Sequence, residues 1–252
     1  IIKKWYDEGK YTPYSDDELI QLLLWLKPKV HPWIRLNRIV RDIPNQYILG
    51  GLMNGNLRQV ISEKMKKENL ICKCIRCREI KVNAVIKPDD KLTIRKYLAS
   101  GSNEYFISLE SQDKNTIFGF LRLRLPNKNV KSIYKDLQNT ALIRELHVYG
   151  QLVSECNVHG ASQHTGIGKR LINEAEVIAF KNGYYKVSVI AGVGTREYYA
   201  KNKFKLLGIE NGEMMIKRVY LPEIYYNILL RFIYVMFPVL FVIYMSIIHL
   251  KY

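Results

Sequence analysis

The stretch Gln163-His164-Thr165-Gly166-Ile167-Gly168-Lys169-Arg170 decides the fold. It lies between a predicted strand at 141–150 and a segment at 166–181 whose apolar residues recur at helical spacing. Two glycines at the start of a helix let backbone N–H groups turn toward one point, and the helix N-terminus adds partial positive charge. Lys169 and Arg170 add two full charges. The stretch therefore predicts a pyrophosphate cradle, but it lacks the Gly-Lys-Ser/Thr ending of a P-loop.

Strands are predicted on both sides of this stretch. In 117–125, leucines alternate with Arg122 and Arg124, so one face is apolar and the other basic. A short helix after Thr195 lies between the last predicted strands. The predicted strands are 92–98, 104–109, 117–125, 141–150, 186–191, 206–207 and 214–219. This order predicts an α+β domain with its main crossover in the second half.

Residues 1–70 are predicted to be mainly helical. Ser15 and Glu18 have the spacing of a capping box, leucine-rich sequence follows, and Pro28 ends the run. A second helix is predicted to begin near Asn56.

Three of the four cysteines, Cys72, Cys74 and Cys77, lie within six residues of one another. Neighbours this close pair only with strain, which favours a reduced compartment and a metal. Three thiolates suit zinc, with a fourth ligand from elsewhere, for which His31 is one candidate. The alternative is a set of three reduced, buried cysteines.

The composition excludes a disordered or fibrous chain. Of 252 residues, 48% are hydrophobic and 25% are charged, and 39 Lys and Arg against 23 Asp and Glu give a net charge of +16. Such an excess favours polyanions such as RNA, DNA, anionic lipid or a phosphorylated cofactor. Residues 35–41, 64–67 and 73–78 are basic stretches that could follow RNA phosphates or simply form solvated charged faces.

The stretch 232–250, FIYVMFPVLFVIYMSIIHL, has no Asp, Glu, Lys or Arg. As a helix it would be roughly 28 Å long at about 1.5 Å per residue, close to the thickness of a bilayer core. We expect a transmembrane helix here, and a buried core helix is the alternative. We expect no secretory signal peptide, because the first residues have no apolar stretch of that length.

The cradle, the strand before it and the tyrosine pair after it resemble the GCN5-related N-acetyltransferase (GNAT) fold. Longer motifs resemble the family of the Elongator catalytic subunit (elongator complex protein 3) over roughly residues 1–219. The motifs that carry this resemblance are Arg41-Asp-Ile-Pro44, Gly55-Asn-Leu-Arg58, Cys72-Lys-Cys-Ile-Arg-Cys-Arg-Glu79, Arg144-Glu-Leu-His-Val-Tyr-Gly150, Gln163-His-Thr-Gly-Ile-Gly168 and Gly192-Val-Gly-Thr-Arg-Glu-Tyr-Tyr199.

This resemblance implies three parts. Residues 1–80 would be the helical C-terminal end of a radical S-adenosylmethionine (SAM) domain with a structural zinc, 81–220 a GNAT domain, and 221–252 a membrane anchor. The family's iron–sulfur cysteine motif is not seen in this chain, so we expect the [4Fe-4S] cluster and SAM only in the full-length protein. Without that part, we do not expect the chain to perform the radical step.

The family's activity implies acetyl-CoA as cosubstrate, tRNA as partner and modification of the wobble uridine toward carboxymethyluridine, with other Elongator subunits as further partners. The implied catalytic residue is Tyr199, near the thioester, while Tyr198 could be a core residue. Glu145 and His164 are both candidates for a general base. The implied cofactor-binding residues are Glu145, Leu146, His147, Val148, Gln163, His164, Gly166, Ile167, Gly168, Lys169 and Tyr199.

Two other functions compete with this one. A lysine acetyltransferase of the same fold would have the same cofactor site, but it would not need the upstream motifs. A non-catalytic RNA-binding scaffold would not need the cradle. For localisation, we expect a single-pass tail anchor with the enzyme facing the cytosol, favouring the mitochondrial outer membrane, with the endoplasmic reticulum as the alternative.

Overall fold

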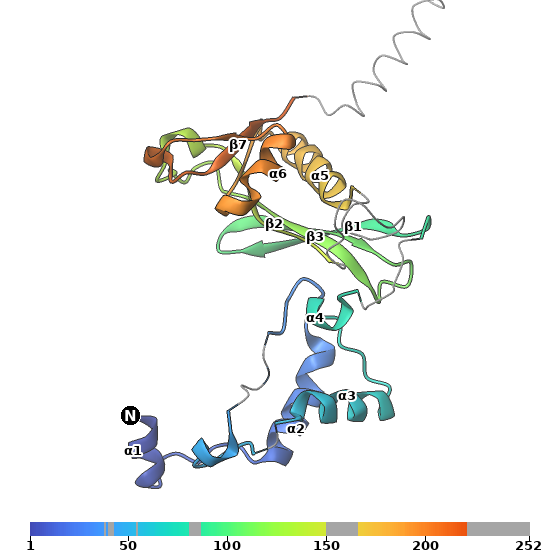
Figure 1. Ribbon diagram of the computed structural model, residues 1–252, viewed down its shortest axis with the longest axis vertical. Helices are drawn as coiled ribbons and strands as arrows, with labels where there is room; N and C mark the ends of the chain where they lie inside the picture. Colours follow the sequence, from blue (N-terminus) through green and yellow to red (C-terminus); the bar gives the residue numbers. More distant parts are fainter. Residues whose placement is uncertain (38, 40–42, 54, 81–86, 150–165, 221–252) are drawn as a thin grey trace, which may run out of the picture. The chain divides into compact units, whose positions relative to one another are not determined.

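The structure is a computed structural model that describes residues 1–37, 39, 43–53, 55–80, 87–149 and 166–220 (Figure 1). The chain divides into two compact units. The first comprises Ile1–Ala84 and Ser111–Ile117, and the second comprises Val85–Glu110 and Phe118–Tyr252.

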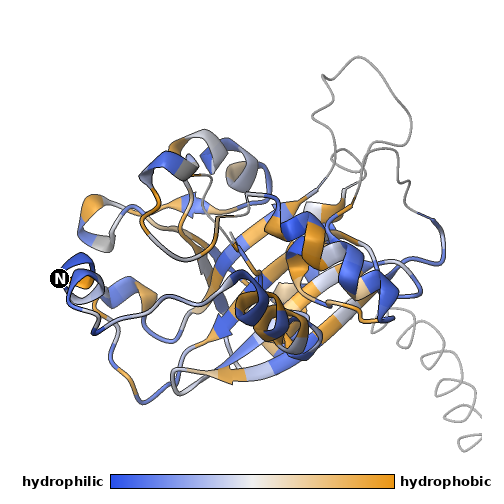
Figure 2. Ribbon diagram, turned by 90° about the horizontal axis from the view of Figure 1, so that it is seen from below, coloured by the Kyte–Doolittle hydropathy of each residue, from blue (hydrophilic) through white to orange (hydrophobic). Residues whose placement is uncertain are grey.

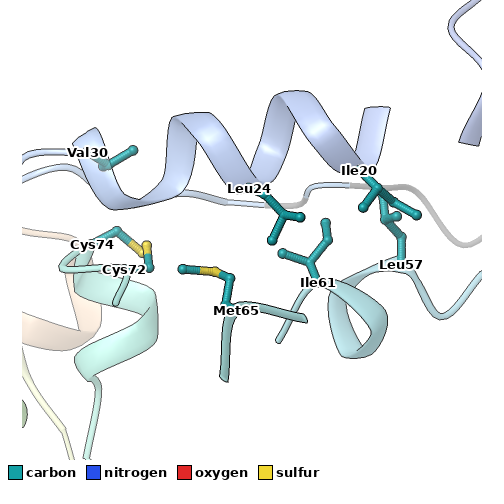
Figure 3. Close-up of a cluster of buried hydrophobic side chains, with 8 residues drawn as sticks. All are labelled: Ile20, Leu24, Val30, Leu57, Ile61, Met65, Cys72 and Cys74. Atoms are coloured by element: carbon teal, nitrogen blue, oxygen red, sulfur yellow. The ribbon is translucent and has the colours of Figure 1, made fainter. Parts of the chain in front are cut away.

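The first unit is built from helices, namely α1 (Ile2–Asp7), α2 (Asp16–Leu26), α3 (Leu57–Lys67) and α4 (Ile75–Arg78). Its core forms where α2 meets α3, and it continues to two cysteines (Figure 3). Leu57 and Ile61 are completely buried. The buried members of this core are Ile20, Leu24, Val30, Leu57, Ile61, Met65, Cys72 and Cys74.

The capping box at α2 is confirmed. The Ser15 hydroxyl accepts a hydrogen bond from the Glu18 amide at 3.3 Å, and the Glu18 carboxylate accepts one from the Ser15 amide at 2.8 Å. The helix expected near Asn56 is also confirmed, because Asn56 is the N-cap of α3.

The second unit is a seven-stranded sheet in the order β1-β2-β3-β4-β5-β7-β6. Neighbouring strands whose pairing is described are antiparallel, except for the parallel pair β4–β5. The strands are β1 (Lys91–Ala99), β2 (Ser102–Glu110), β3 (Ile117–Leu125), β4 (Ala141–Val148), β5 (Lys186–Val189), β6 (Lys205–Leu206) and β7 (Met215–Arg218). The sequence predicted all seven strands, and β3 agrees at both ends.

The helix α5 (Ile167–Lys181) lies on one face of the sheet (Figure 1). Its approach is close at Gly119 of β3, where a Cβ atom would lie 3.1 Å from Cγ2 of Ile167. Leu121 and Leu123 alternate with Arg122 along β3, so the leucines share the face of Gly119 and are completely buried. Figure 2 shows both hydrophilic and hydrophobic residues along the strands. The opposite face therefore carries the polar residues of β3.

A second helix, α6 (Arg196–Lys201), follows β5. Thr195 is its N-cap residue, as expected, but its side chain does not accept a capping hydrogen bond. The hydroxyl instead donates to the carbonyl of Gly192 at 2.9 Å. This bond stabilises the turn before α6 rather than its first amides.

Within the parts of the chain that the structure describes, no helix is both long and apolar enough to cross a membrane. The stretch 232–250, expected to be a transmembrane helix, lies outside the described residues.

Candidate functional site

The strand β4 parts from its parallel neighbour β5 halfway along its length. Residues 141–143 pair with 187–189 of β5. The register between β4 and β3 then shifts, because Leu123 pairs with Ile143 whereas Arg122 pairs with Glu145. Arg144 is thus one extra residue, and such a β-bulge bends the strand that carries it.

Beyond the bulge, residues 145–148 pair with β3, and no pairing of these residues with β5 is present in the described strands. Their backbone groups on the side of β5 are therefore available to a ligand. Buried backbone amides need hydrogen-bond partners, which the amides of a pantetheine chain could supply.

The N-terminus of α5 lies beside the end of β4. Gly166 is its N-cap residue and has φ of 73°, a left-handed conformation that favours glycine. Gly168 is buried in the first turn, and a Cβ atom there would lie 3.7 Å from Cγ2 of Val148. Lys169 and Arg170 are exposed in the same turn. The predicted cradle is thus present as a helix N-terminus with two cations, while Gln163 and His164 lie outside the described residues.

The two tyrosines of α6 lie in different surroundings. Tyr198 is 39% exposed, and its hydroxyl would lie 2.2 Å from a Cβ atom at Gly168. Tyr199 is 7% exposed and packs edge-on against Phe204, with ring centroids 5.6 Å apart. Burial raises the pKa of Tyr199 to about 12 and also raises that of Tyr198. The phenol that contacts the cradle is therefore that of Tyr198.

A network of charged groups crosses four strands on the sheet face opposite α5. Glu104 of β2 is 1% exposed and accepts hydrogen bonds from Arg144 at 2.8 Å and from Arg124 at 3.1 Å. It also accepts one from the Tyr97 hydroxyl at 2.9 Å. That hydroxyl in turn accepts a hydrogen bond from Arg122 at 3.0 Å. Because Glu104 is satisfied by three donors, it stays charged within the sheet.

The same network ends at β4 in a carboxylate and an imidazole. Arg122 forms an ion pair with one oxygen of Glu145. The other oxygen of Glu145 lies 3.2 Å from Nε2 of His147. Hydrogen bonding with His147, reinforced by Arg122, lowers the pKa of Glu145 from 4.5 to about 2.

The cysteines of the first unit form a second site. The Sγ atoms of Cys72, Cys74 and Cys77 all lie within 4.8 Å of one another, and hydrogen bonds from Cys72 and Cys77 lower the pKa of Cys74. The ammonium group of Lys27, a buried residue, lies 3.7 Å from Sγ of Cys77. Three sulfurs that stabilise a thiolate fit a soft or borderline metal.

His31 does not join the cysteines among the described residues. Its ring is stacked on Trp33, with centroids 4.5 Å apart. A fourth ligand is therefore not found in the described part of the chain.

Part of the basic surface expected for RNA is engaged within the chain. Arg78 is buried and donates to the carbonyls of Pro32, Lys73 and Lys114, so this residue of the stretch 73–78 is part of neither a solvated face nor a phosphate-binding surface. Arg35 and Arg76 both pair with Glu79. Arg38 and Arg41 lie outside the described residues. Exposed lysines remain on and near α3, namely Lys66, Lys67 and Lys73.

The site combines the diverging strands β4 and β5, the glycine N-terminus of α5, and the tyrosines of α6. The family found by comparison with known families agrees with these features. Residues 77–204 match the profile of the acetyltransferase (GNAT) family. The chain belongs to the GNAT acetyltransferase family. Ahead of this match, residues 1–67 match the radical SAM C-terminal domain.

Individual relatives match most of this chain. This GNAT chain is 37% identical over 220 residues to the tRNA uridine(34) acetyltransferase of Methanocaldococcus jannaschii, a match that covers 83% of the chain and 40% of the relative. It is 39% identical over 223 residues to Elongator complex protein 3 of Saccharomyces cerevisiae, a match that covers 84% of this chain and 38% of the relative. A solved Elp3 of Methanocaldococcus infernus with an N-terminal deletion gives a TM-score of 0.74 at 35% identity, covering 86% of this chain and 51% of that one. The chain thus spans about two fifths of the length of these curated relatives.

Sequence reasoning missed several residues of this GNAT site. It named His147 only as one of the cofactor-binding residues and assigned no role to the side chains of Tyr97, Glu104 and Arg122. The alternation of arginines with leucines in β3 was the available signal, because it placed Arg122 and Arg124 on one face. Their acidic partners come from β2 and β4, which pairing alone reveals.

The charge of Glu145 predicts an acid-dependent loss of stability. A carboxyl whose pKa is lowered on folding stabilises the protein above its unfolded value, near 4.5, and this contribution disappears as the pH falls toward 2. Glu145→Gln should therefore lower the melting temperature at pH 7, and flatten its fall between pH 4.5 and 2. Solvent screening of this partly exposed group limits the effect to on the order of 1–3 °C. Calorimetric melts against pH measure it.

Glu63→Gln is the control, because this carboxylate is exposed on α3 and, among the described residues, accepts a hydrogen bond only from Gln59. Identical pH profiles for both variants and the parent would contradict a stabilising ion pair at Glu145.

Proposed function

We propose that the chain is the acetyltransferase part of an acetyl-CoA-dependent enzyme that modifies uridine 34, the wobble position of tRNA. The observation that carries the proposal is the divergence of β4 from β5 beside the glycine N-terminus of α5. The match to the radical SAM C-terminal domain and the printed names of the relatives support the tRNA substrate. A plain lysine acetyltransferase would not need the first unit.

Each part of the site has a role toward acetyl-CoA, which supplies an activated acetyl thioester. The backbone of residues 145–148 would bind the pantetheine amides. The first turn of α5 would bind the pyrophosphate, with Lys169 adding charge. The phenols of Tyr198 and Tyr199 are the candidate proton donors to the leaving thiolate, and Tyr198 is the one that contacts the cradle.

The rest of the reaction belongs to the longer protein. We propose that the [4Fe-4S] cluster and SAM are held by a radical domain whose C-terminal end is the first unit, and that the product is the first stage of the carboxymethyl side chain. Other Elongator subunits are proposed partners, as the name of the yeast relative suggests.

Gly168→Glu tests the cradle. The added carboxylate would lie where the pyrophosphate binds and would meet the Tyr198 hydroxyl. We expect a loss of acetyl-CoA affinity of at least about 100-fold in calorimetry, together with the loss of tRNA-stimulated release of free thiol from acetyl-CoA. Lys169→Glu, which reverses one exposed charge without a packing change, should weaken binding less. Gly55→Glu is the matched control, since a side chain there meets open space.

Parental affinity in both cradle variants would contradict the proposed cofactor site. Acetyl transfer to histone peptides by the parent chain, with no effect of tRNA on thiol release, would favour the lysine acetyltransferase instead.

We also propose that the cysteine cluster holds a structural zinc ion through Cys72, Cys74 and Cys77. The support is the convergence of three sulfurs at the end of the helical core, where metal binding would join the chain after α3 to α2. The fourth ligand would come from outside the described residues or from water.

Cys74→Ser should abolish zinc binding and destabilise the first unit, because the metal would contribute folding free energy. Elemental analysis should give about one zinc per parental chain and none per variant, and the first thermal transition should occur at a lower temperature. Cys156→Ser, far from the cluster in sequence, should match the parent. Metal-free parental protein with the same stability as Cys74→Ser would contradict the zinc site.

Finally, we propose that residues 232–250 insert into a membrane with the enzyme on the cytosolic side, favouring the mitochondrial outer membrane over the endoplasmic reticulum. The support is the absence of charged residues from this apolar stretch.

A reporter fused to residues 220–252 should sediment with membranes, resist alkaline carbonate and colocalise with a mitochondrial marker. Phe241→Arg with Ile243→Arg should release it, since each central arginine costs about 2.5–3.5 kcal/mol for insertion. A soluble parental reporter would contradict the proposal, and colocalisation with an endoplasmic reticulum marker would correct the organelle.

A further inference from the structure

The imidazole of His147 is placed and oriented by side chains from other strands. Its Nε2 atom lies 3.2 Å from the Glu145 carboxylate, and its ring lies 5.1 Å from that of Phe120. The Glu145 carboxylate is held in turn by Arg122, which is bound to the Tyr97 hydroxyl. Since a carboxylate only accepts hydrogen bonds, Nε2 carries the proton. Among the described residues, no hydrogen bond to Nδ1 is present.

The position of His147 is as informative as its orientation. Val148, the next residue, points toward the first turn of α5, where Gly168 lies. Because side chains alternate along a strand, His147 points to the opposite face of the sheet. A ligand with its phosphates at α5 and its chain along the open edge of β4 would run past His147 toward Glu145. The His147 side chain is 42% exposed, so water can reach it.

We propose that His147 is the catalytic base that activates water for hydrolysis of the acetyl thioester, and that Glu145 is a positioning residue that fixes the imidazole with Nδ1 unprotonated. This inference rests on the proposed function, because it assumes acetyl-CoA along β4.

The step balances with water as the only co-reactant. Nδ1 of His147 accepts a proton from water as its oxygen forms a bond to the thioester carbonyl carbon. The carbon–sulfur bond then breaks, and the sulfur leaves with its electron pair. The imidazolium returns the proton to the sulfur, directly or through a phenol of α6. The products are a carboxylic acid, which ionises, and the thiol of CoA.

Glu145 is a poor candidate for the base itself. With its pKa lowered to about 2, its carboxylate has little affinity for a proton at neutral pH. Both its oxygens are also engaged, one by Arg122 and one by His147. A charged orienting group that does not itself take the proton is the role of the aspartate in a serine protease triad.

The test uses the full chain with acetyl-CoA and tRNA, and it measures free thiol release and, by calorimetry, acetyl-CoA affinity. His147→Gln should bind acetyl-CoA within about threefold of the parent and lose roughly 10²–10⁴ in rate. Glu145→Gln should lose at least about tenfold in rate with similar affinity. In His147→Ala, added imidazole should restore part of the rate in a concentration-dependent manner. A structural defect would not respond to imidazole. Glu63→Gln is the control for the loss of a carboxylate.

A second readout needs no turnover. In the nitrogen-15 spectrum of the histidine-labelled chain without ligand, the His147 signal is the one that disappears in His147→Gln. This signal should show the neutral tautomer protonated at Nε2. Glu145→Gln should weaken this preference. A tautomer protonated at Nδ1 in the parent would overturn the inference.

The outcomes separate the two proposals. A parental chain that fails to bind acetyl-CoA overturns both. A chain that binds acetyl-CoA but releases no thiol with or without tRNA overturns the role of His147 and leaves the cofactor site standing. Parental rates in His147→Gln, or no response of His147→Ala to imidazole, do the same.

Discussion

One extra residue in β4 determines most of what surrounds the site. Up to Ile143 the strand is paired on both sides, but Arg144 is accommodated as a bulge, and among the described strands the rest of β4 pairs with β3 alone. The break leaves four residues with backbone groups open toward β5, beside the N-terminus of α5. It also changes where side chains point, because a bulge shifts the alternation by one residue. Glu145 and His147 thereby share the face of Arg122, while Val148 faces the helix.

The charged residues on that face favour one register for the bulged strand β4. Glu104 accepts from Arg124 and from the bulge residue Arg144, so the bulge is held by a side chain from β2. Removing one partner of such a buried set leaves an uncompensated charge, which typically costs about 3–5 kcal/mol. An apolar set of similar volume could be equally stable, but it would not select this register. We interpret the network as fixing the geometry of β4 at the point where it opens.

The sequence was a good guide to elements whose cause is local. The capping box of α2, the alternation in β3 and the periodic apolar face of α5 each depend on neighbours within four residues, and all are found. The bulge at Arg144 has no local signature, because it exists only relative to β3. The arginine and glutamate partners of the network are 20 or more residues apart in the sequence, as Arg122 is from Glu145. Pairing across strands, rather than composition, places them together.

The tyrosine pair is another feature that the sequence alone does not decide. Neighbouring positions on a helix point about 100° apart, so Tyr198 and Tyr199 meet different surroundings. Their sequence is the same residue twice, whereas in the structure Tyr199 packs on Phe204 and the Tyr198 hydroxyl lies at the cradle. With Tyr198 on the helix side of β4 and His147 on the other face, groups that can donate and accept a proton lie on opposite sides of the opened strand. A thioester hydrolysis needs both, one for the leaving sulfur and one for the attacking water, and the alternation of β4 is what separates them.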